Sequence, residues 1–185
     1  MNLKKENLII MYSGGSDSRL LLELALSMKL KPYCVLFDYN QKHIKELDYA
    51  RHQLETKKIN YQIVKIKDLN INSGLTGNKI EGQFKNVHSM NVPSRNLIFT
   101  GLAAAIAEDK NIDTIWYGAN AEDYKNKFPD CLQEWIGKVN ELLNINSSVV
   151  IKLEAPLIGF SKERVLELSE YYGIDQKAVF SGYGE

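Results

Sequence analysis

The sequence has few cysteines, no long apolar run and no net charge. Among its 185 residues only Cys34 and Cys131 are cysteines, which excludes a disulfide framework and a four-cysteine metal site and favours a reducing, cytoplasmic location. No apolar run approaches the roughly 20 residues that a transmembrane helix requires. Lysine and arginine number 23, as do aspartate and glutamate, so no net field would attract nucleic acid. We therefore expect a single domain over residues 1–185 with small-molecule partners, no nucleic acid and no membrane.

Short apolar runs alternate with segments of helical periodicity along the chain. Strands are predicted over residues 8–12, 33–38, 61–66, 114–118 and 149–153. Helices are predicted over residues 18–29, 43–58, 95–107 and 130–143, and a last helix is predicted between a Ser161 cap and Gly173. This alternation predicts an α/β domain with a doubly wound, parallel five-stranded sheet and helices on both faces. The third strand is the most polar and is expected near an edge, and residues 68–92 are expected to form a long loop.

Residues 13–18 read Ser-Gly-Gly-Ser-Asp-Ser at the junction of the first strand and the first helix. Glycines let backbone N–H groups approach a ligand, and a helix N-terminus adds unpaired N–H groups and partial positive charge. The stretch therefore favours an anion site, with phosphate as the usual occupant. The alternative is a plain strand-to-helix turn in which Ser or Asp caps the helix. The spacing is not GxxxxGK[ST] and the loop holds no lysine, so a lysine for the phosphates must come from elsewhere.

These residues resemble the pyrophosphate loop of the ATP pyrophosphatases, the PP-loop superfamily. Later segments narrow the resemblance to the 7-cyano-7-deazaguanine synthase (QueC) family, whose motifs are FDYGQxH, SxLT, VPGRN, GxNxxDxxxYPDC and PLxxxxK. The similar segments are residues 37–43, 73–76, 92–96, 118–131 and 156–162, in the same order. The resemblance implies an adenine nucleotide alpha hydrolase-like (HUP) fold of PP-loop type.

The sequence departs from the family pattern in three places. Asn40 and Ser94 stand where the family usually has glycine, so a different local backbone shape is expected there. The family continues past a Ser-Cys-Tyr segment into cysteines that bind zinc, whereas this sequence reads Ser181-Gly182-Tyr183 and ends at Glu185. The chain thus resembles a shortened member, and no zinc is expected.

The resemblance implies an AMP-forming carbon–nitrogen ligase of queuosine biosynthesis that uses ATP and Mg²⁺. It would adenylate 7-carboxy-7-deazaguanine and aminate it with ammonia to give the nitrile preQ0, and the shortened end leaves open an arrest at the amide. A homodimer is also implied. Two alternatives remain open at this point. One is a PP-loop enzyme with another acceptor, a tRNA or a protein amine, and the other is a nucleotide- or deazaguanine-binding protein without turnover.

Candidate nucleotide-binding residues follow from the loop and from the matched motifs. The predicted pyrophosphate cradle comprises Ser13, Gly14, Gly15, Ser16 and Ser18. Asp17 would hold Mg²⁺ or shape the loop, with a helix cap as the alternative. Lys162, a cation at a helix start, would reach the phosphates, and a solvated surface lysine is the alternative.

Further candidates lie at the ends of later elements. Arg95 would fork onto a phosphate or carboxylate, with an ordinary surface ion pair as the alternative. Asp38 would accept a hydrogen bond from adenine or ribose, or hold a metal. The alternative is that Asp38 is a turn residue that ends the strand. The resemblance adds Asn96 and Gly118 to the nucleotide-binding residues and Arg95, Asp17 and Lys162 to the catalytic ones.

The candidate base-binding residues gather in one acidic loop. A deazaguanine ring presents adjacent N–H donors, and one carboxylate can accept two such bonds side by side, a role predicted for Asp130. Asp123 is the second acid of this loop, and Tyr124 or Phe128 would stack on the ring. The alternative is two acids in an ordinary polar loop. His43, in a matched segment, is a candidate proton carrier.

Overall fold

The computed structural model describes residues 6–39, 44–67, 94–121 and 129–174. Its five strands form one sheet in the order β3-β2-β1-β4-β5, and every neighbouring pair is parallel. The strands are β1 (Leu8–Met11), β2 (Pro32–Asp38), β3 (Tyr61–Lys65), β4 (Thr114–Trp116) and β5 (Lys152–Glu154). This arrangement confirms the predicted parallel five-stranded sheet, with the polar third strand at an edge.

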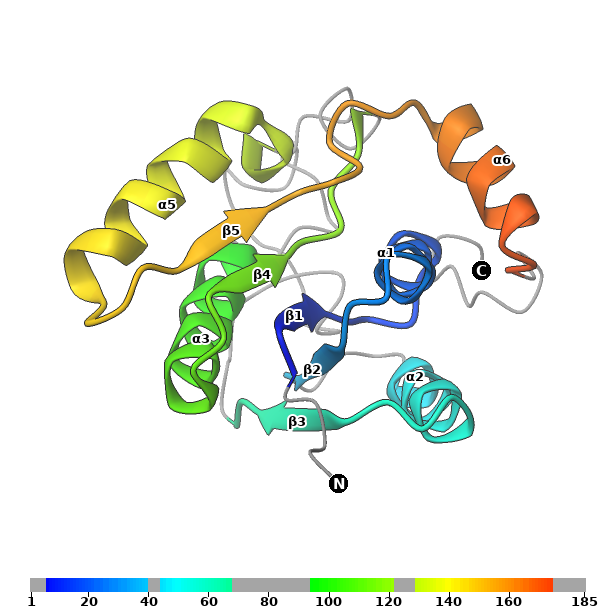
Figure 1. Cartoon of the computed structure of the whole chain (residues 1–185), viewed down its shortest axis with the longest axis horizontal. Coiled ribbons are helices and arrows are strands. Elements are labelled where there is room, and N and C mark those ends of the chain that lie inside the picture. The colour runs from blue at the N-terminus through cyan, green and yellow to red at the C-terminus, as the bar shows by residue number, and fades with distance from the viewer. Residues whose placement is uncertain (1–5, 40–43, 68–93, 122–128, 175–185) are drawn as a thin grey trace, which may run out of the picture.

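Helices cover both faces of the sheet (Figure 1). The helices are α1 (Ser16–Ser27), α2 (Ile44–Thr56), α3 (Arg95–Lys110), α5 (Gln133–Asn146) and α6 (Lys162–Tyr171), with a short 3-10 turn, η2 (Pro129–Cys131), before α5. The helices α1, α2 and α6 lie on one face and α3 and α5 on the other. Within the described ranges, none of these helices combines the length and apolarity that crossing a bilayer requires.

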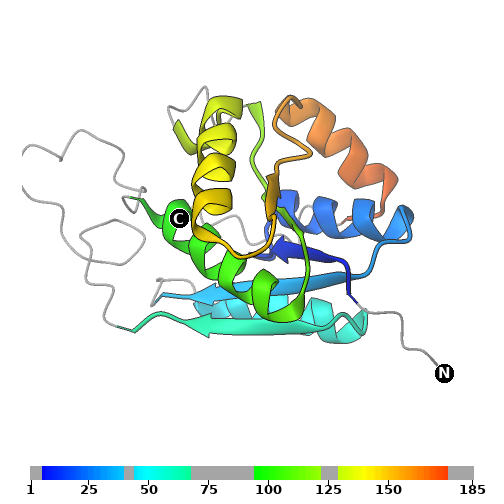
Figure 2. The same cartoon turned by 60° about the vertical axis from the view of Figure 1, so that its left-hand side comes forward.

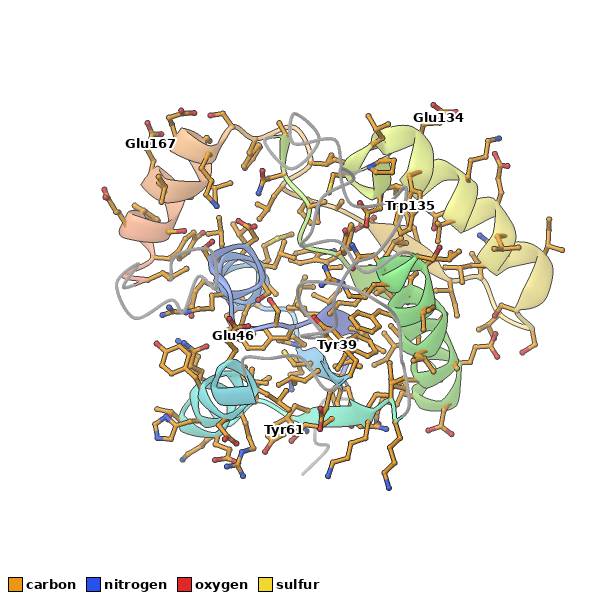
Figure 3. The ribbon with its side chains drawn as sticks, turned by 180° about the vertical axis from the view of Figure 1, so that it is seen from behind. Tyr39, Glu46, Tyr61, Glu134, Trp135 and Glu167 are labelled. Carbon is orange, nitrogen blue, oxygen red and sulfur yellow. The ribbon has the colours of Figure 1, made fainter. Side chains whose placement is uncertain are left out.

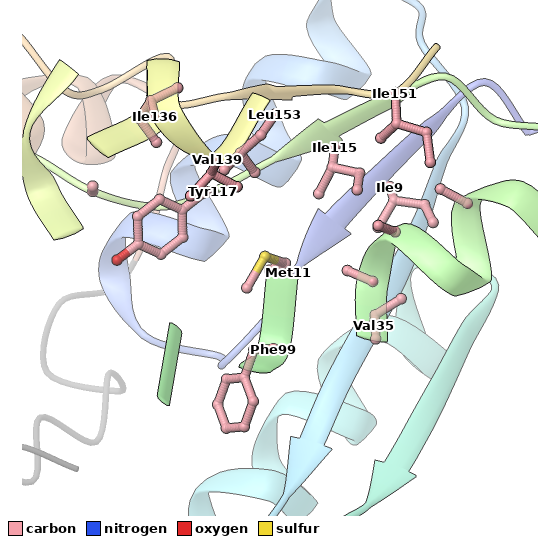
Figure 4. Packing of buried hydrophobic residues seen from close by; sticks show 14 of the residues in the cluster. Ile9, Met11, Val35, Phe99, Ile115, Tyr117, Ile136, Val139, Ile151 and Leu153 are labelled. Atoms are coloured by element: carbon pink, nitrogen blue, oxygen red, sulfur yellow. The ribbon is translucent and has the colours of Figure 1, made fainter. Parts of the chain in front are cut away.

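Alternation along the strands explains why both faces are apolar. Ile9 and Met11 of β1 pack with Phe99 of α3 in one buried cluster, as Figure 4 shows. Leu8 and Ile10 point to the opposite cluster, beneath α1, α2 and α6. Because successive side chains of a strand face opposite sides, a continuous apolar run fills two cores at once.

The last strand begins later than predicted. A strand was expected over residues 149–153, but β5 starts at Lys152, which pairs with Thr114 of β4. Val150 is 76% exposed. An edge strand with a single neighbour is only as long as that neighbour allows, and β4 has three residues.

The starts of α1 and α5 differ from the prediction, whereas the signals predicted for both ends of α6 are confirmed. The first helix begins two residues early, at Ser16, because Gly15 is its N-cap. The helix expected from residue 130 begins at Gln133, since η2 takes up residues 129–131. Ser161 caps α6 by accepting from the Arg164 N–H, and Gly173 follows that helix in the left-handed conformation (φ +67°).

The strand order places two connections side by side at the carboxyl edge of the sheet. β4 lies next to β1, although β2 and β3 intervene in the sequence. The chain passes from β1 to α1 on one face, whereas α3, which leads into β4, covers the other. In open α/β sheets such a reversal of strand order is where ligands bind. Residues 13–18 after β1 and residues 117–120 after β4 adjoin there (Figure 2).

Candidate active site

The loop after β1 is folded around the hydroxyl of Ser18. This oxygen accepts from the Gly14 N–H at 3.1 Å and the Ser13 N–H at 3.3 Å. The hydroxyl donates to the Gly15 carbonyl at 3.1 Å. The serine hydroxyl expected to donate to phosphate is therefore engaged within the loop. These are long hydrogen bonds, which a phosphate oxygen can replace, and the first-turn N–H groups of α1 have no acceptor within the helix.

Gly14 is required by the packing of α2 on this loop. Its φ is +83°, and a Cβ built there would lie 2.7 Å from the Ala50 Cβ. The glycine thus permits a left-handed turn and also allows the backbone of the loop to lie close to helix α2. At Gly15 a Cβ would meet only the Ser13 hydroxyl, at 3.4 Å.

Asp17 connects three elements at the start of α1. Its Oδ2 accepts from the Asn120 Nδ2 at 3.2 Å, and its Oδ1 lies 3.9 Å from the Lys162 Nζ. Burial raises the pKa of the Asp17 carboxyl, and the Lys162 charge and the Asn120 amide oppose that rise. Because the N-cap of α1 is Gly15, the interpretation of Asp17 as the helix cap is wrong.

Lys162 supplies the positive charge that the loop lacks. It is the first residue of α6, and α6 lies beside α1 in both Figure 1 and Figure 2. Its side chain is 45% exposed, so it keeps contact with solvent while it faces the buried Asp17. Lys162 is thus a solvated surface lysine, as the alternative expected, and its ammonium also faces the Asp17 carboxylate.

Gly118 and Asn120 belong to the segment that follows β4. A Cβ at Gly118 would lie 3.5 Å from both the Asp17 Cβ and the Ser18 nitrogen, so this glycine rests against the start of α1. Asn120 is 1% exposed, and sequence reasoning did not select it. The signal that could have selected Asn120 was its position as the asparagine of the GxN in the motif matched by residues 118–131.

Arg95 faces the end of β2. Its Nη1 donates to the Tyr39 hydroxyl at 3.1 Å, and its guanidinium lies 5.8 Å from the centroid of that ring. Tyr39 in turn packs on Phe99 of α3, and Figure 3 shows it from behind the sheet. Among the described residues, the hydrogen-bond acceptor of Arg95 is thus a tyrosine hydroxyl rather than the carboxylate of a surface ion pair. Asp38 precedes Tyr39 as the last residue of β2, and its carbonyl accepts from the Ile66 N–H at 2.7 Å, which extends the strand pairing rather than forming a turn.

Asn96, Tyr117 and Asp130 form a second polar cluster. The Asn96 Nδ2 donates to the Asp130 Oδ2 and, at 2.8 Å, to the Tyr117 hydroxyl. The ring of Tyr117 is buried among the apolar side chains of Figure 4, and its hydroxyl points away from them. Burial and the nearby Asp130 charge raise the pKa of Tyr117 well above its ordinary value. A predicted nucleotide-binding residue and a predicted base-binding residue are thus in direct contact.

Ser94 keeps the backbone shape that a glycine favours. Its φ and ψ are 54° and 13°, in the left-handed region, immediately before α3 begins at Arg95. Serine therefore holds a conformation that glycine adopts without strain, and the strain amounts to about 1–2 kcal/mol. The predicted residues His43, Asp123, Tyr124 and Phe128, and also Asn40, lie outside the described residues.

The donor set of the first cluster fits Mg²⁺. Within the described residues the Asp17 Oδ1 is buried without a hydrogen-bond partner, and a carboxylate oxygen is a ligand that Mg²⁺ prefers. Mg²⁺ in nucleotide sites usually binds one or two carboxylates together with the phosphates. The described ranges contain no group of three His, Cys, Asp or Glu side chains that could hold a metal by themselves.

Solved structures of other proteins share this fold. The chain is similar over its full length to the NH3-dependent NAD synthetase from Campylobacter jejuni, with a TM-score of 0.59, 15% identity and 71% of that chain covered. It is also similar to NMN synthetase from Francisella tularensis, with a TM-score of 0.52, 17% identity, and 98% of this chain and 67% of that one covered. At these identities the likeness establishes the fold, a HUP-like domain of PP-loop type.

Sequence comparison identifies the family. The model of "Queuosine biosynthesis protein QueC" matches residues 7–185. The 7-cyano-7-deazaguanine synthase of Prochlorococcus marinus strain MIT 9515 is 36% identical over 99% of this chain and 87% of its own length. That of Picrophilus torridus is 32% identical over 95% of this chain and 77% of its own length. The chain belongs to the QueC family, which confirms the resemblance seen in its motifs.

Proposed function

We propose that this protein catalyses the ATP-dependent amination of 7-carboxy-7-deazaguanine to 7-cyano-7-deazaguanine. The observation that carries the proposal is that the segment after β4 joins two polar clusters. Its residue Asn120 holds Asp17 beside the glycine loop, and its residue Tyr117 contacts Asn96, which holds Asp130. A nucleotide and a base can therefore lie on either side of one short segment, in a chain whose relatives carry this name.

The first step activates the carboxylate, which is a poor electrophile because its oxygen is a poor leaving group. A carboxylate oxygen of the substrate attacks the α-phosphorus of ATP, pyrophosphate departs, and an acyl adenylate forms. The loop N–H groups of residues 13–18 and the Lys162 ammonium stabilise the charge that develops on the phosphates. Lys162 lies close enough to Asp17 to turn from the carboxylate to a phosphate oxygen without movement of α6.

Asp17 has a second role in this step when Mg²⁺ accompanies ATP. The metal would be held by the Asp17 Oδ1 and would neutralise phosphate charge. Asn120 fixes the other oxygen of the same carboxylate and so sets its direction. Arg95, Asp38 and Gly118 complete the proposed nucleotide side, with the Arg95 fork aimed at a phosphate or at the substrate carboxylate.

Ammonia then attacks the carbonyl carbon. The bond between that carbon and the AMP oxygen breaks, AMP departs with the bonding electrons, and the loss of a proton leaves the amide. A second ATP adenylates the amide oxygen in the same way, and departure of AMP with loss of the remaining nitrogen-bound protons gives the nitrile. Asp130 accepts hydrogen bonds from the ring N–H groups, so that the reacting carbon stays in place through both rounds. Asp123, Tyr124 and Phe128 are the other proposed base contacts, and His43 is the proposed proton carrier.

Product analysis tests the proposal directly. The protein is incubated with 7-carboxy-7-deazaguanine, ATP, Mg²⁺ and ammonium, and products are identified by mass spectrometry. We expect the nitrile with two AMP per turnover. With ammonium omitted, labelled pyrophosphate should exchange into ATP only when the carboxylate substrate is present. An amide with one AMP would place the end of the reaction at the first round, and no AMP with any of these substrates would overturn the proposal.

We also propose that the protein works in the cytoplasm as a homodimer without a nucleic-acid partner. The balanced charge of 23 basic and 23 acidic residues supports the absence of nucleic-acid binding. Light scattering on the purified protein reports the subunit number. A tRNA gel shift at low and physiological salt reports nucleic-acid binding, and a salt-resistant shift would contradict the proposal.

A further inference from the structure

We infer that Asn96 is a positioning residue that aims the Asp130 carboxylate at the deazaguanine ring, and that it does not act on the nucleotide. This inference rests on the proposed function for the identity of the base. It replaces the nucleotide-binding role that the motif suggested for Asn96.

Both hydrogens of the Asn96 amide are directed at the second cluster. The nitrogen donates to the Asp130 Oδ2 and to the Tyr117 hydroxyl. A carboxylate only accepts hydrogen bonds, so the nitrogen and not the oxygen of the amide must face Asp130. A planar group that makes two such bonds has one orientation, and it fixes the Asp130 oxygen that it contacts.

The support behind Asn96 is rigid. The backbone carbonyl of Asn96 accepts a hydrogen bond from the Thr100 hydroxyl at 2.7 Å, and Thr100 is fully buried in α3. Tyr117 is buried between α3 and α5, with its ring centroid 5.9 Å from that of Trp135. The orientation of the amide is therefore set by two packed helices and by the end of β4.

Asp130 retains acceptor capacity after these contacts. A carboxylate offers about four lone-pair sites, and Asn96 takes one of them. The Cys131 thiol lies 3.9 Å from the other oxygen, Oδ1. Asp130 itself is partly exposed on η2, so the remaining lone pairs can accept the two adjacent N–H groups of the ring.

The amide also matters because it is neutral and donates. An acid of the same shape at residue 96 would place two carboxyl groups in contact, and these repel each other at neutral pH unless one of them binds a proton. Asn96→Asp therefore keeps the volume of the side chain but removes the donor. Its effect on base binding should be strongest at neutral pH and weaker in mild acid.

The test is a reciprocal exchange measured by calorimetric binding of 7-carboxy-7-deazaguanine, alongside KM for base and for ATP. We expect Asn96→Asp to weaken base binding about 10- to 100-fold at neutral pH, as for a buried acceptor that loses its donor, with the KM for ATP changed less than threefold. The double variant Asn96→Asp/Asp130→Asn restores the internal hydrogen bond with its donor and acceptor exchanged. It should recover the melting temperature and leave base binding weak, because an amide now faces the ring.

The outcomes separate this inference from the proposed function. Recovery of base binding in the double variant, or an equal loss of ATP and base affinity in Asn96→Asp, would overturn the positioning role. Asn144→Asp, an exposed asparagine on α5, is the control and should bind the base as the native protein does. If the native protein forms no AMP, the proposed reaction fails, and base affinity in the same set of variants still decides the role of Asn96.

Discussion

Asp17 and Asp130 each accept a hydrogen bond from an asparagine amide, but the two carboxylates differ in the charge around them. One oxygen of Asp17 accepts a hydrogen bond from the Asn120 amide, and the other faces the Lys162 ammonium. Asp130 accepts a hydrogen bond from the Asn96 amide, and the Cys131 thiol lies 3.9 Å from its Oδ1. The two asparagines thus perform the same local task in two different electrostatic settings.

This difference matches the ligand that each cluster would hold. A triphosphate carries several negative charges, so its site needs a cation and a carboxylate that can share a metal ion. A purine-like edge is neutral and offers N–H donors, so a fixed anionic acceptor suffices. Burial raises the pKa of the Asp17 carboxyl, and the nearby Lys162 charge opposes that rise.

Loss of the Lys162 charge should produce the largest effect, and it should affect only the cluster proposed to bind the nucleotide. We expect Lys162→Gln to lower kcat/KM for ATP about 100- to 1,000-fold, because one preorganised charge on the phosphates is lost. Base affinity, measured by calorimetry, should stay within about threefold of the native value.

The control for this variant is Arg164→Gln, on the same helix. Arg164 pairs with Glu167 on the exposed side, and its loss should change kcat/KM little. Equal losses in the two variants would mean that α6 only needs positive charge and that Lys162 has no particular role.

Gly14→Ala should unfold the loop of the same cluster. A left-handed conformation and a 2.7 Å approach to the Ala50 Cβ should together lower the free energy of unfolding by about 3 kcal/mol, measured by urea denaturation. Gly15→Ala is the matched control, since its Cβ meets nothing closer than 3.4 Å and its φ is –71°. Similar stability of the two variants would show that α2 yields easily to the loop.

Asp17→Asn should make the protein more stable and less active. The folded pKa of Asp17 is raised, so the native state binds its proton more tightly than the unfolded state does. Stability from this group is therefore greatest at low pH and is lost as pH rises from about 3.8 through the folded pKa. Asn removes the buried charge, and we expect about 1 kcal/mol of added stability at pH 7.

Denaturation across the pH range checks this prediction. The stability difference between Asp17→Asn and the native protein should shrink as the pH is lowered, because protonated Asp17 is also neutral. A native protein more stable than the variant at pH 7 would mean that the Lys162 contact outweighs the burial.

Ser94→Gly should produce the smallest effect and concerns the support of the base side. Ser94 holds a left-handed conformation just before Arg95 and Asn96, and glycine adopts it without strain. We expect a gain of about 1 kcal/mol in the free energy of unfolding. Asn111→Gly, at the left-handed end of α3 (φ 55°), should gain less because asparagine tolerates this region. Equal gains would mean that serine is no more strained in this region than asparagine.

Local sequence pattern was enough to predict most of the helices and strands and the glycine-containing turn between β1 and α1. The apolar run 8–12 and the glycines after it predicted a buried strand that leads into a helix, and β1 and α1 are found there. The start of β5 was missed because Val150 is β-branched but lies beyond the last partner that β4 offers. Propensity describes a segment by itself, whereas the length of an edge strand depends on its neighbour.

The sequence by itself determined the parallel α/β fold, the glycine-containing turn between β1 and α1 and the acidic residues after β4, because each depends on residue types within one short stretch. Only the tertiary structure decided that Lys162 faces Asp17 and that Asn96 faces Asp130, over separations of 145 and 34 residues. A hydrogen bond or an ion pair between distant residues depends on the strand order and on which face each helix covers. Sequence spacing does not record either, so the partners of these carboxylates emerge only when β4 lies beside β1.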